Sequence, residues 1–166
     1  MVKLFTVGII TASDKGYEGK REDKSGEVIK KIVENKGYEV VRYKILPDDR
    51  EKLSEEMLYM CDSLKLNLVL TTGGTGFSKR DVTPEATRDV VERLAPGIPE
   101  AIRSYSLKIT PRAMLSRAIS GIRQDSLIIN LPGSPKAVEE SLEFVIDSID
   151  HGLSILTGRD YDCARK

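Results

Sequence analysis

The strongest constraint on the fold is a regular alternation of short apolar runs with segments that carry apolar residues at helical spacing. Several runs are apolar on both faces, as in strands that helices cover on both sides. The expected strands are residues 4–11, 38–46, 66–71 and 126–131. The expected helices are residues 25–36, 49–64, 83–94 and 136–156. This alternation predicts an α/β fold in which a mostly parallel central sheet carries helices on both faces.

Residues that start or stop helices flank several of these segments. Gly37 follows the first expected helix and Gly158 follows the last, and glycine adopts the left-handed conformation that ends many helices. Thr83, Pro84 and Glu85 would supply a cap, a proline in the first turn and an acid near the positive end of the third helix. The remaining stretch is less regular, and there we expect a helix at 101–107, a turn at 113–116 and a short strand at 118–123.

The charge balance argues against one class of function. The 166 residues include 26 Lys and Arg and 26 Asp and Glu, so the formal net charge is zero. A nucleic-acid-binding protein needs a surplus of positive charge. No apolar run is long enough to span a bilayer, and the first residues lack the cleavage site of a signal peptide. We therefore expect a single cytoplasmic domain over residues 1–166, with neither a nucleic-acid nor a membrane partner.

The chain is poor in the side chains that often build metal sites and acid–base pairs. It has one histidine, His151, and two cysteines, Cys61 and Cys163, that lie far apart. A local cysteine zinc site is excluded because no CxxC pair exists. We expect Cys61 to fill the core and His151 to lie near the end of a helix.

Small, hydroxyl-bearing or acidic residues follow every predicted strand. Loops after parallel strands share one edge of the sheet, and ligands of such folds bind in the crevice at that edge. The loops are residues 11–14 (Thr-Ala-Ser-Asp), 46–49 (Leu-Pro-Asp-Asp), 71–77 (Thr-Thr-Gly-Gly-Thr-Gly-Phe) and 130–135 (Asn-Leu-Pro-Gly-Ser-Pro). The sequence therefore predicts a single polar pocket along this edge.

The loop after the third strand is the clearest candidate for phosphate binding. Gly73, Gly74 and Gly76 allow positive φ and let backbone amides approach an anion closely, while Thr72 and Thr75 add hydroxyl donors. The loop matches neither the Walker sequence nor GxGxxG. A plain turn between a strand and a helix would need only two glycines, so we favour a nucleotide cradle.

A second glycine turn, Pro132, Gly133 and Ser134, leads into the last helix. Ser134 can simply cap that helix. In the functional interpretation, Gly133 instead opens space for a ligand that faces the helix amides. The residues themselves leave both interpretations open.

Three aspartates are candidate metal-facing carboxylates. Asp49 suits the cap of the second helix, which leaves Asp48 free to point into the crevice. Asp81 stands next to Lys79 and Arg80, so a salt bridge explains it equally well. Carboxylates beside a phosphate loop repel an anionic ligand unless a cation intervenes. Mg²⁺, held by one or two carboxylates and by substrate phosphates, would resolve this conflict.

Two other groups of residues are weaker candidates. Arginine suits phosphate binding, but most surface arginines bind nothing, so each arginine of the irregular stretch is a weak candidate. These arginines are Arg103, Arg112, Arg117 and Arg123. The segment 23–26 (Asp-Lys-Ser-Gly) is expected to be a helix cap and nothing more.

Four stretches together resemble the molybdopterin adenylyltransferases, which include bacterial MogA and the N-terminal domain of gephyrin. They are 71–77, 80–87 (Arg-Asp-Val-Thr-Pro-Glu-Ala-Thr), 114–117 (Met-Leu-Ser-Arg) and 130–134. The resemblance runs from Val7 to about Leu156 and implies a three-layer α/β/α sandwich, usually a homotrimer. It also implies Mg²⁺-dependent transfer of AMP from ATP to the terminal phosphate of molybdopterin, with release of pyrophosphate. A separate molybdate-insertion protein, and so an expected partner, acts next.

The resemblance also assigns roles to individual residues. Asp48 and Asp81 match acids required for catalysis, acting through Mg²⁺. The residues implied to bind the nucleotide and its phosphates are Thr72, Gly73, Gly74, Thr75, Gly76, Pro132, Gly133 and Ser134. Those implied to contact molybdopterin are Ser13, Asp14, Ser106, Ser116 and Arg117. Related MoaB-type proteins often alter the segment 80–84, which is intact here and favours the active, MogA-type branch.

A second function class remains open, a non-catalytic module that holds molybdopterin or a nucleotide and passes it on. Such a module would keep the glycine loops but would not need the metal-facing carboxylates. The presence of both Asp48 and Asp81 favours the enzyme. A phosphate monoester has a second pKa of about 6, so it attacks without a histidine base, in accord with a chain whose one histidine is His151.

Overall fold

A six-stranded sheet runs through residues 5–159, which are the residues that the computed structural model describes. Its strands are β1 (Thr6–Ala12), β2 (Glu39–Leu46), β3 (Leu68–Thr72), β4 (Arg93–Leu94), β5 (Ser120–Arg123) and β6 (Ser126–Leu131). They lie in the order β2-β1-β3-β6-β5-β4. The first four strands in this order are parallel, and β5 and β4 extend the sheet antiparallel. The predicted, mostly parallel sheet is confirmed.

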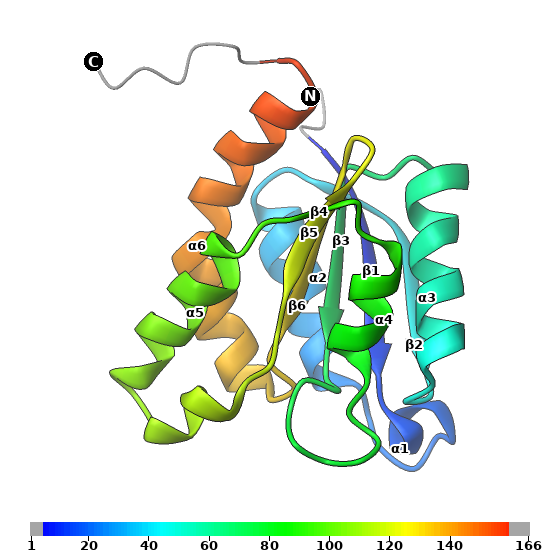
Figure 1. The fold of residues 1–166 in the computed structure, drawn as a ribbon, viewed down its shortest axis with the longest axis vertical. Helices are drawn as coiled ribbons and strands as arrows, with labels where there is room; N and C mark the ends of the chain where they lie inside the picture. Colours follow the sequence, from blue (N-terminus) through cyan, green and yellow to red (C-terminus); the bar gives the residue numbers. More distant parts are fainter. Residues whose placement is uncertain (1–4, 160–166) are drawn as a thin grey trace.

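Helices cover both faces of this sheet and complete the predicted three-layer α/β/α sandwich (Figure 1). On one face lie α2 (Lys24–Asn35), α5 (Gly97–Leu107) and α6 (Pro135–Leu156). On the other lie α3 (Arg50–Leu58) and α4 (Thr83–Val90). Three shorter pieces are α1 (Asp14–Tyr17), the π-helical turn η1 (Tyr59–Ser63) and the 3₁₀-helix η2 (Pro111–Leu115). No helix within residues 5–159 is long and apolar enough to cross a membrane.

Alternate residues of the central strands build two separate cores. In β1, Val7 and Ile9 face the core beneath α2 and α6, whereas Ile10 faces the core beneath α3 and α4. This follows from the two-residue repeat of side chains along a strand. All residues of β3 and β6 are buried, which explains their uninterrupted apolar runs. Cys61 is only 2% exposed in the second core, as predicted.

The predicted third helix, 83–94, is too long. It ends at Val90, and Arg93–Leu94 form β4 against β5. The backbone leaves the helix because the strand pairing continues on both sides of β4: the Glu92 amide donates to Ile122 O (2.9 Å) and the Ala95 amide to Ser120 O (2.8 Å). The predicted Thr83 cap is also wrong, because Val82 occupies the cap position and the buried Thr83 hydroxyl makes no hydrogen bond.

The other helix ends follow the sequence more closely. Asp49 caps α3, and its side chain accepts from the Lys52 amide at 2.9 Å, but the predicted helix 49–64 changes to a π-turn after Leu58. Gly37 and Gly158 have φ of 92° and 72°, so both predicted stops are confirmed. Within 96–123 the structure has a helix, a 3₁₀-helix and a short strand. Leu4, the first residue of the expected strand 4–11, and Cys163 lie outside the described residues.

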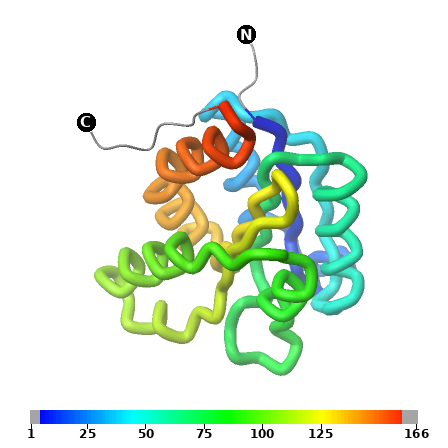
Figure 2. The backbone as a smooth tube through the Cα atoms, turned by 45° about the horizontal axis from the view of Figure 1, so that its top comes forward, coloured from blue at the N-terminus to red at the C-terminus, as the bar shows by residue number. Residues whose placement is uncertain are grey.

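The fold brings the loops of interest to one end of the molecule. The parallel strands point toward the end where α1 and the loop of residues 73–82 lie, and where α2 and α6 begin (Figure 1). The loop of residues 73–82, called the Asp81 loop below, stands out from the body in both views (Figure 2). Helix N-termini and strand carboxyl ends therefore surround the same space.

Candidate active site

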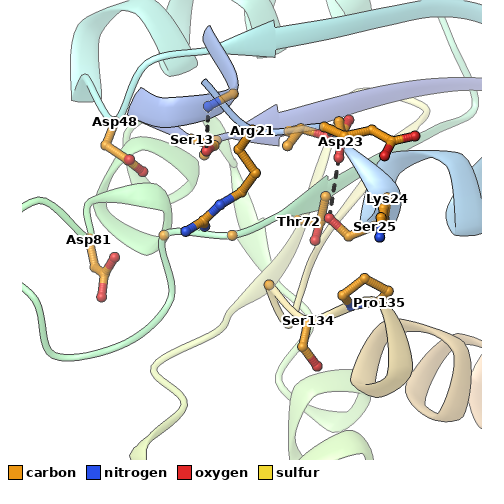
Figure 3. Close-up of a pocket in the computed structure, with 17 residues that line it drawn as sticks. Ser13, Arg21, Asp23, Lys24, Ser25, Asp48, Thr72, Asp81, Ser134 and Pro135 are labelled. Atoms are coloured by element: carbon orange, nitrogen blue, oxygen red, sulfur yellow. Dashed lines mark hydrogen bonds between the residues drawn. The ribbon is translucent and has the colours of Figure 1, made fainter. Parts of the chain in front are cut away.

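A cavity of about 790 Å³ opens at this end of the sheet (Figure 3). Residues from the loops after β1, β2, β3 and β6 line it. Eight of the residues predicted for the site are among them: Ser13, Asp48, Thr72, Gly73, Gly74, Asp81, Gly133 and Ser134. Segments far apart in the sequence therefore meet at one polar pocket.

Two glycine turns line this cavity, and in the first of them Gly73 and Gly74 lie too close to neighbouring atoms for side chains. A Cβ on Gly73, whose φ is 90°, would lie 2.4 Å from Ala12 O. A Cβ on Gly74, whose φ is 68°, would lie 2.3 Å from Thr83 Oγ1. A Cβ on Gly133 would lie 3.5 Å from Gly73 Cα, so the two turns are in contact. This geometry exposes backbone to a ligand and explains the glycines physically.

Two side chains tie these turns to neighbouring elements. Thr72 Oγ1 donates to Pro132 O at 2.6 Å and joins the end of β3 to the turn after β6. Ser134 caps α6 by accepting from the Ala137 amide at 3.1 Å, and it lines the cavity as well. The two interpretations of Ser134 are therefore compatible, because a capping hydroxyl can still donate its own proton.

Asp48 is fixed by a reciprocal pair of hydrogen bonds with Asp14. The Asp48 amide donates to Asp14 Oδ1 (3.0 Å), and the Asp14 amide donates to Asp48 Oδ2 (3.1 Å). Arg80 holds the other side of Asp14 through Nε (3.0 Å) and Nη2 (2.9 Å). Asp14 does not line the cavity itself, so its contacts orient Asp48 instead.

The electrostatic surroundings separate these two carboxyls. Burial raises the pKa of Asp48, and the nearby charges of Asp14 and Asp81 raise it further. The hydrogen bond from Arg80 lowers the pKa of Asp14. Asp48 is therefore the carboxyl whose charge is costly in the absence of a cation.

Asp81 faces the same cavity from the Asp81 loop (Figure 3). Its Oδ2 accepts from the Ser78 amide at 3.0 Å, and its own amide donates to Ser78 O at 3.0 Å. A Cβ on Gly76 would lie 2.9 Å from Asp81 Oδ2, so the glycine makes room for this turn. Asp81 is thus held within its loop rather than by a salt bridge to Lys79 or Arg80.

The two carboxylates fit a divalent cation shared with a ligand. Within residues 5–159, no group of three or more His, Cys, Asp or Glu side chains could hold a metal ion by itself. Mg²⁺ commonly takes only one or two carboxylates and completes its shell with phosphate oxygens and water. Burial, and to a lesser extent the charges of Asp14 and Asp81, raise the pKa of Asp48, so a cation bound there would offset a costly negative charge.

The opposite wall of the cavity was missed by sequence reasoning. It consists of Arg21, Glu22, Asp23, Lys24 and Ser25, just before and within the first turn of α2. Figure 3 shows Arg21 extending across the cavity, with Asp48 and Asp81 on one side and Lys24 and Ser25 on the other. A pair of cations next to a helix N-terminus and a strand-end loop was the available signal.

Asp23 shows why this wall was missed. It does cap α2, accepting from the Gly26 amide at 3.0 Å, as predicted. It also accepts from Thr11 Oγ1 at 2.7 Å and from the Tyr43 hydroxyl. The expectation that segment 23–26 is a cap and nothing more is wrong, because these bonds fix the cap against β1 and β2 at the edge of the cavity.

The structure places seven predicted site residues outside the cavity lining: Asp14, Thr75, Gly76, Ser106, Ser116, Arg117 and Pro132. Pro132 accepts the hydrogen bond of the Thr72 hydroxyl through its carbonyl oxygen. Ser106 lies in the last turns of α5 and Ser116 at the end of η2, so neither reaches this cavity in the described chain. Arg117 donates to Gly76 O (2.7 Å) and Asp81 O (2.8 Å) and thus contacts the Asp81 loop.

A protein-family model described as a probable molybdopterin binding domain matches residues 8–151. The chain belongs to this family. A family member from Helicobacter pylori strain J99, named molybdopterin adenylyltransferase, is 42% identical over 92% of this chain and 88% of its own length. Gephyrin from Dictyostelium discoideum is also 42% identical over 92% of the chain, which matches 23% of gephyrin.

Solved structures of the molybdopterin-binding family share the fold described above. The molybdopterin biosynthesis enzyme MoaB from Thermus thermophilus superposes with a TM-score of 0.89 at 43% identity. The match covers 95% of this chain and 99% of that one. The predicted resemblance to the molybdopterin adenylyltransferase family and its three-layer fold are both confirmed.

Proposed function

We propose that this chain transfers AMP from ATP to the terminal phosphate of molybdopterin. An oxygen of the pterin phosphate forms a bond to the α-phosphorus of ATP. The bond between the α- and β-phosphates breaks, and pyrophosphate leaves with the electron pair. The meeting of two glycine turns with Asp48 and Asp81 in one cavity carries this proposal. The relatives named molybdopterin adenylyltransferase support it, because they align over most of the chain.

The roles of the cavity residues follow from their chemistry. The backbone around Gly73, Gly74 and Gly133 is open to phosphate groups, and Ser134 offers a hydroxyl at the N-terminus of the long helix α6. Arg21 and Lys24 add positive charge on the same wall. We assign the triphosphate to this wall and the glycine turns, and the pterin phosphate to the side of Ser13. Alignment of two anions, together with charge compensation, supplies most of the catalysis in reactions of this kind.

Mg²⁺ would be held by Asp48 and Asp81 together with phosphate oxygens of the substrate. When bound, it offsets the negative charge that develops on the leaving pyrophosphate. The protein's own part is to hold the two carboxylates facing one space. Asp48 is held to this task by its paired hydrogen bonds to Asp14.

The protein needs no general base for this step. The attacking phosphate monoester is already largely dianionic near neutral pH, because its second pKa is about 6. His151, the one histidine of the chain, lies in α6 and does not line the cavity. The task of the site is therefore to overcome repulsion between two anions, not to move a proton.

The decisive experiment is incubation of the purified protein with molybdopterin and MgATP, followed by detection of adenylylated pterin and pyrophosphate. We expect both products, and we expect EDTA to abolish them. Binding of either substrate without product would support the non-catalytic module instead. Equal turnover in EDTA and in Mg²⁺ would remove the metal from the proposal.

We also propose that the chain forms a homotrimer, works in the cytoplasm as one domain over residues 1–166, and delivers its product to a molybdate-insertion protein. An apolar surface on α5, η2 and α6 supports self-association. It exposes Leu107, Ile109, Met114, Leu115 and Phe144, the last of which stacks on Tyr105. Such a surface is typical of protein interfaces. Sedimentation equilibrium tests this proposal, and a monomer at micromolar concentration would contradict it.

A further inference from the structure

The Asp81 loop is tied to the rest of the molecule near its tip by the ion pair of Arg80 with Asp14, which does not hold the Asp81 backbone itself. It has no regular secondary structure between β3 and α4, and residues 77–80 are exposed. Within its tip, two bonds join Ser78 to Asp81, and the Arg80 amide donates a longer one to Ser78 Oγ at 3.4 Å. A carboxylate that must face a cation and a phosphate needs a firmer support than this. Another residue must therefore support the Asp81 carboxylate.

Arg117 contacts the loop at both of its ends. The Arg117 amide donates to Thr75 O at 2.8 Å, and Nε donates to Gly76 O at 2.7 Å. At the other end, Nη2 donates to Asp81 O at 2.8 Å and Nη1 pairs with Glu85 in the first turn of α4. One half-buried side chain thus joins the start of the loop, its end and the helix that follows.

We propose that Arg117 is a positioning residue that fixes the Asp81 loop, and so the Asp81 carboxylate, for adenylyl transfer. This proposal rests on the proposed function and refines it. The family resemblance assigns Arg117 to molybdopterin contact. However, every guanidinium nitrogen already donates to a protein oxygen, and Arg117 does not line the cavity. Arg117 acts through Asp81, not on a substrate.

The charge of Glu85 reinforces this arrangement. Burial opposes ionisation of Glu85, but the hydrogen bond and charge of Arg117, with the charge of Arg50, hold its pKa below the usual value. An ionised acid also suits the positive N-terminal end of α4. The ion pair therefore ties the Asp81 loop to a helix that the buried core holds in place.

Only arginine matches the directions of these acceptors. The guanidinium presents its donors in a rigid, planar fork and serves three separated oxygens at once. A lysine keeps the positive charge, but its single nitrogen cannot reach Gly76 O, Asp81 O and Glu85 in the same way. The substitution R117K therefore removes the geometry while it retains the charge.

The control is R103K. Arg103 donates to Ala118 O at 2.8 Å and to Ser116 O at 3.4 Å, so it anchors the same segment as Arg117 but does not touch the Asp81 loop. Both arginines are half-buried. Any effect that arises from a general loosening of residues 116–118 should appear in both variants.

The experiment combines hydrogen exchange with steady-state kinetics on the full chain. The amides of Ser78 and Asp81 report on the loop, because each donates within it. In R117K we expect severalfold faster exchange over residues 75–82, with α6 unchanged. We expect kcat to fall about 10- to 100-fold, the loss that a displaced catalytic group causes, while KM for molybdopterin changes less than about twofold. R103K should leave all three values unchanged.

Two results would overturn the proposal. Unchanged loop exchange in folded R117K would show that Arg117 does not hold the loop. A raised KM for molybdopterin with unchanged kcat and exchange would make Arg117 a substrate contact. E85Q gives a milder test, since the carbonyl contacts remain, and we expect smaller changes in the same direction. Exchange needs no turnover, so it still tests Arg117 if the wild-type protein transfers no AMP.

Discussion

Asp48 and Asp81 face the same cavity from two differently built corners. Asp48 lies two residues after β2, and its hydrogen-bond partner Asp14 lies two residues after β1, so the sheet sets its position. Asp81 lies far beyond β3 in an exposed loop, and its position depends on Ser78 and on Arg117. The sheet itself positions Asp48, whereas Asp81 needs specific side-chain contacts to hold its loop.

This difference bears on what each carboxylate contributes energetically. Asp48 is half-buried, its pKa is raised by burial and by like charges, and it therefore destabilises the fold when ionised. Asp81 lies in a solvated loop and makes a local turn. We infer that the unfavourable electrostatic energy of the site is concentrated at the rigid corner, around Asp48. The loop corner, around Asp81, is the part that becomes disordered most easily.

The largest expected effect is on activity and should be common to both corners. D48N and D81N each keep an oxygen acceptor for the neighbouring amide, so both variants should fold. Each loses the charge that would face the proposed Mg²⁺, and we expect adenylyl transfer to fall by about 10²- to 10³-fold. The assay is pyrophosphate release with molybdopterin and MgATP. Near-normal turnover in either variant would remove that residue from the mechanism.

A smaller effect is expected from alanine in the glycine turns between the corners. In G74A the new Cβ meets Thr83 Oγ1 at 2.3 Å and Asp48 Oδ1 at 3.2 Å at a φ of 68°. We expect the free energy of unfolding to fall by about 3 kcal/mol, from backbone strain and overpacking together. Urea denaturation measures this change.

Gly19 provides the matched control for G74A. Its φ is 75°, but a Cβ there would meet nothing within 4 Å. G19A should therefore cost only the backbone strain, about 1 kcal/mol. Equal losses in G19A and G74A would show that crowding beneath Gly74 is unimportant.

The smallest expected effect is on the free energy of unfolding, which should change differently in D48N and in D81N. The pKa of Asp48 is raised in the folded state, so its contribution favours folding at low pH and is lost as the pH rises through that pKa. Replacing the carboxylate by an amide removes this penalty. D48N should therefore be slightly more stable than wild type at pH 7, and the difference should vanish below about pH 4.

D81N serves as the comparison in the same unfolding series. Its stability should stay close to wild type at pH 7, because the amide oxygen can still accept from the Ser78 amide. Thermal or urea unfolding at several pH values is the measurement. A D48N protein that is less stable than wild type at pH 7 would contradict the assignment of strain to the rigid corner.

The sequence predicted the corner that the sheet builds. Apolar runs located the parallel strands, and the rule that their carboxyl ends share an edge brought Asp48, Gly74, Asp81 and Gly133 to one cavity before any coordinates. Local chemistry also predicted the cap of Asp49 and offered that of Ser134 as one of two interpretations. These features depend on residues that are close together in the sequence, so local patterns can predict them.

What the sequence did not predict depends on distant contacts. The support of the Asp81 loop by Arg117 joins residues 41 positions apart, and no periodicity reports such a contact. The helix at 83–94 was too long because pairing of β4 with β5 overrides local helical preference. The Arg21 wall was missed because Arg21 lies beyond α1, and no local pattern shows that the chain returns to the cavity there.

The starts of α2 and α6 on one wall, opposite Asp48 and Asp81, give the cavity an electrical direction. The helix N-termini attract the phosphates of an entering nucleotide. Asp48 and Asp81 repel the same phosphates unless a metal ion accompanies them. Free ATP and metal-complexed ATP should therefore settle differently. We therefore expect the cavity to bind a nucleotide that carries its own counterion in preference to one that does not.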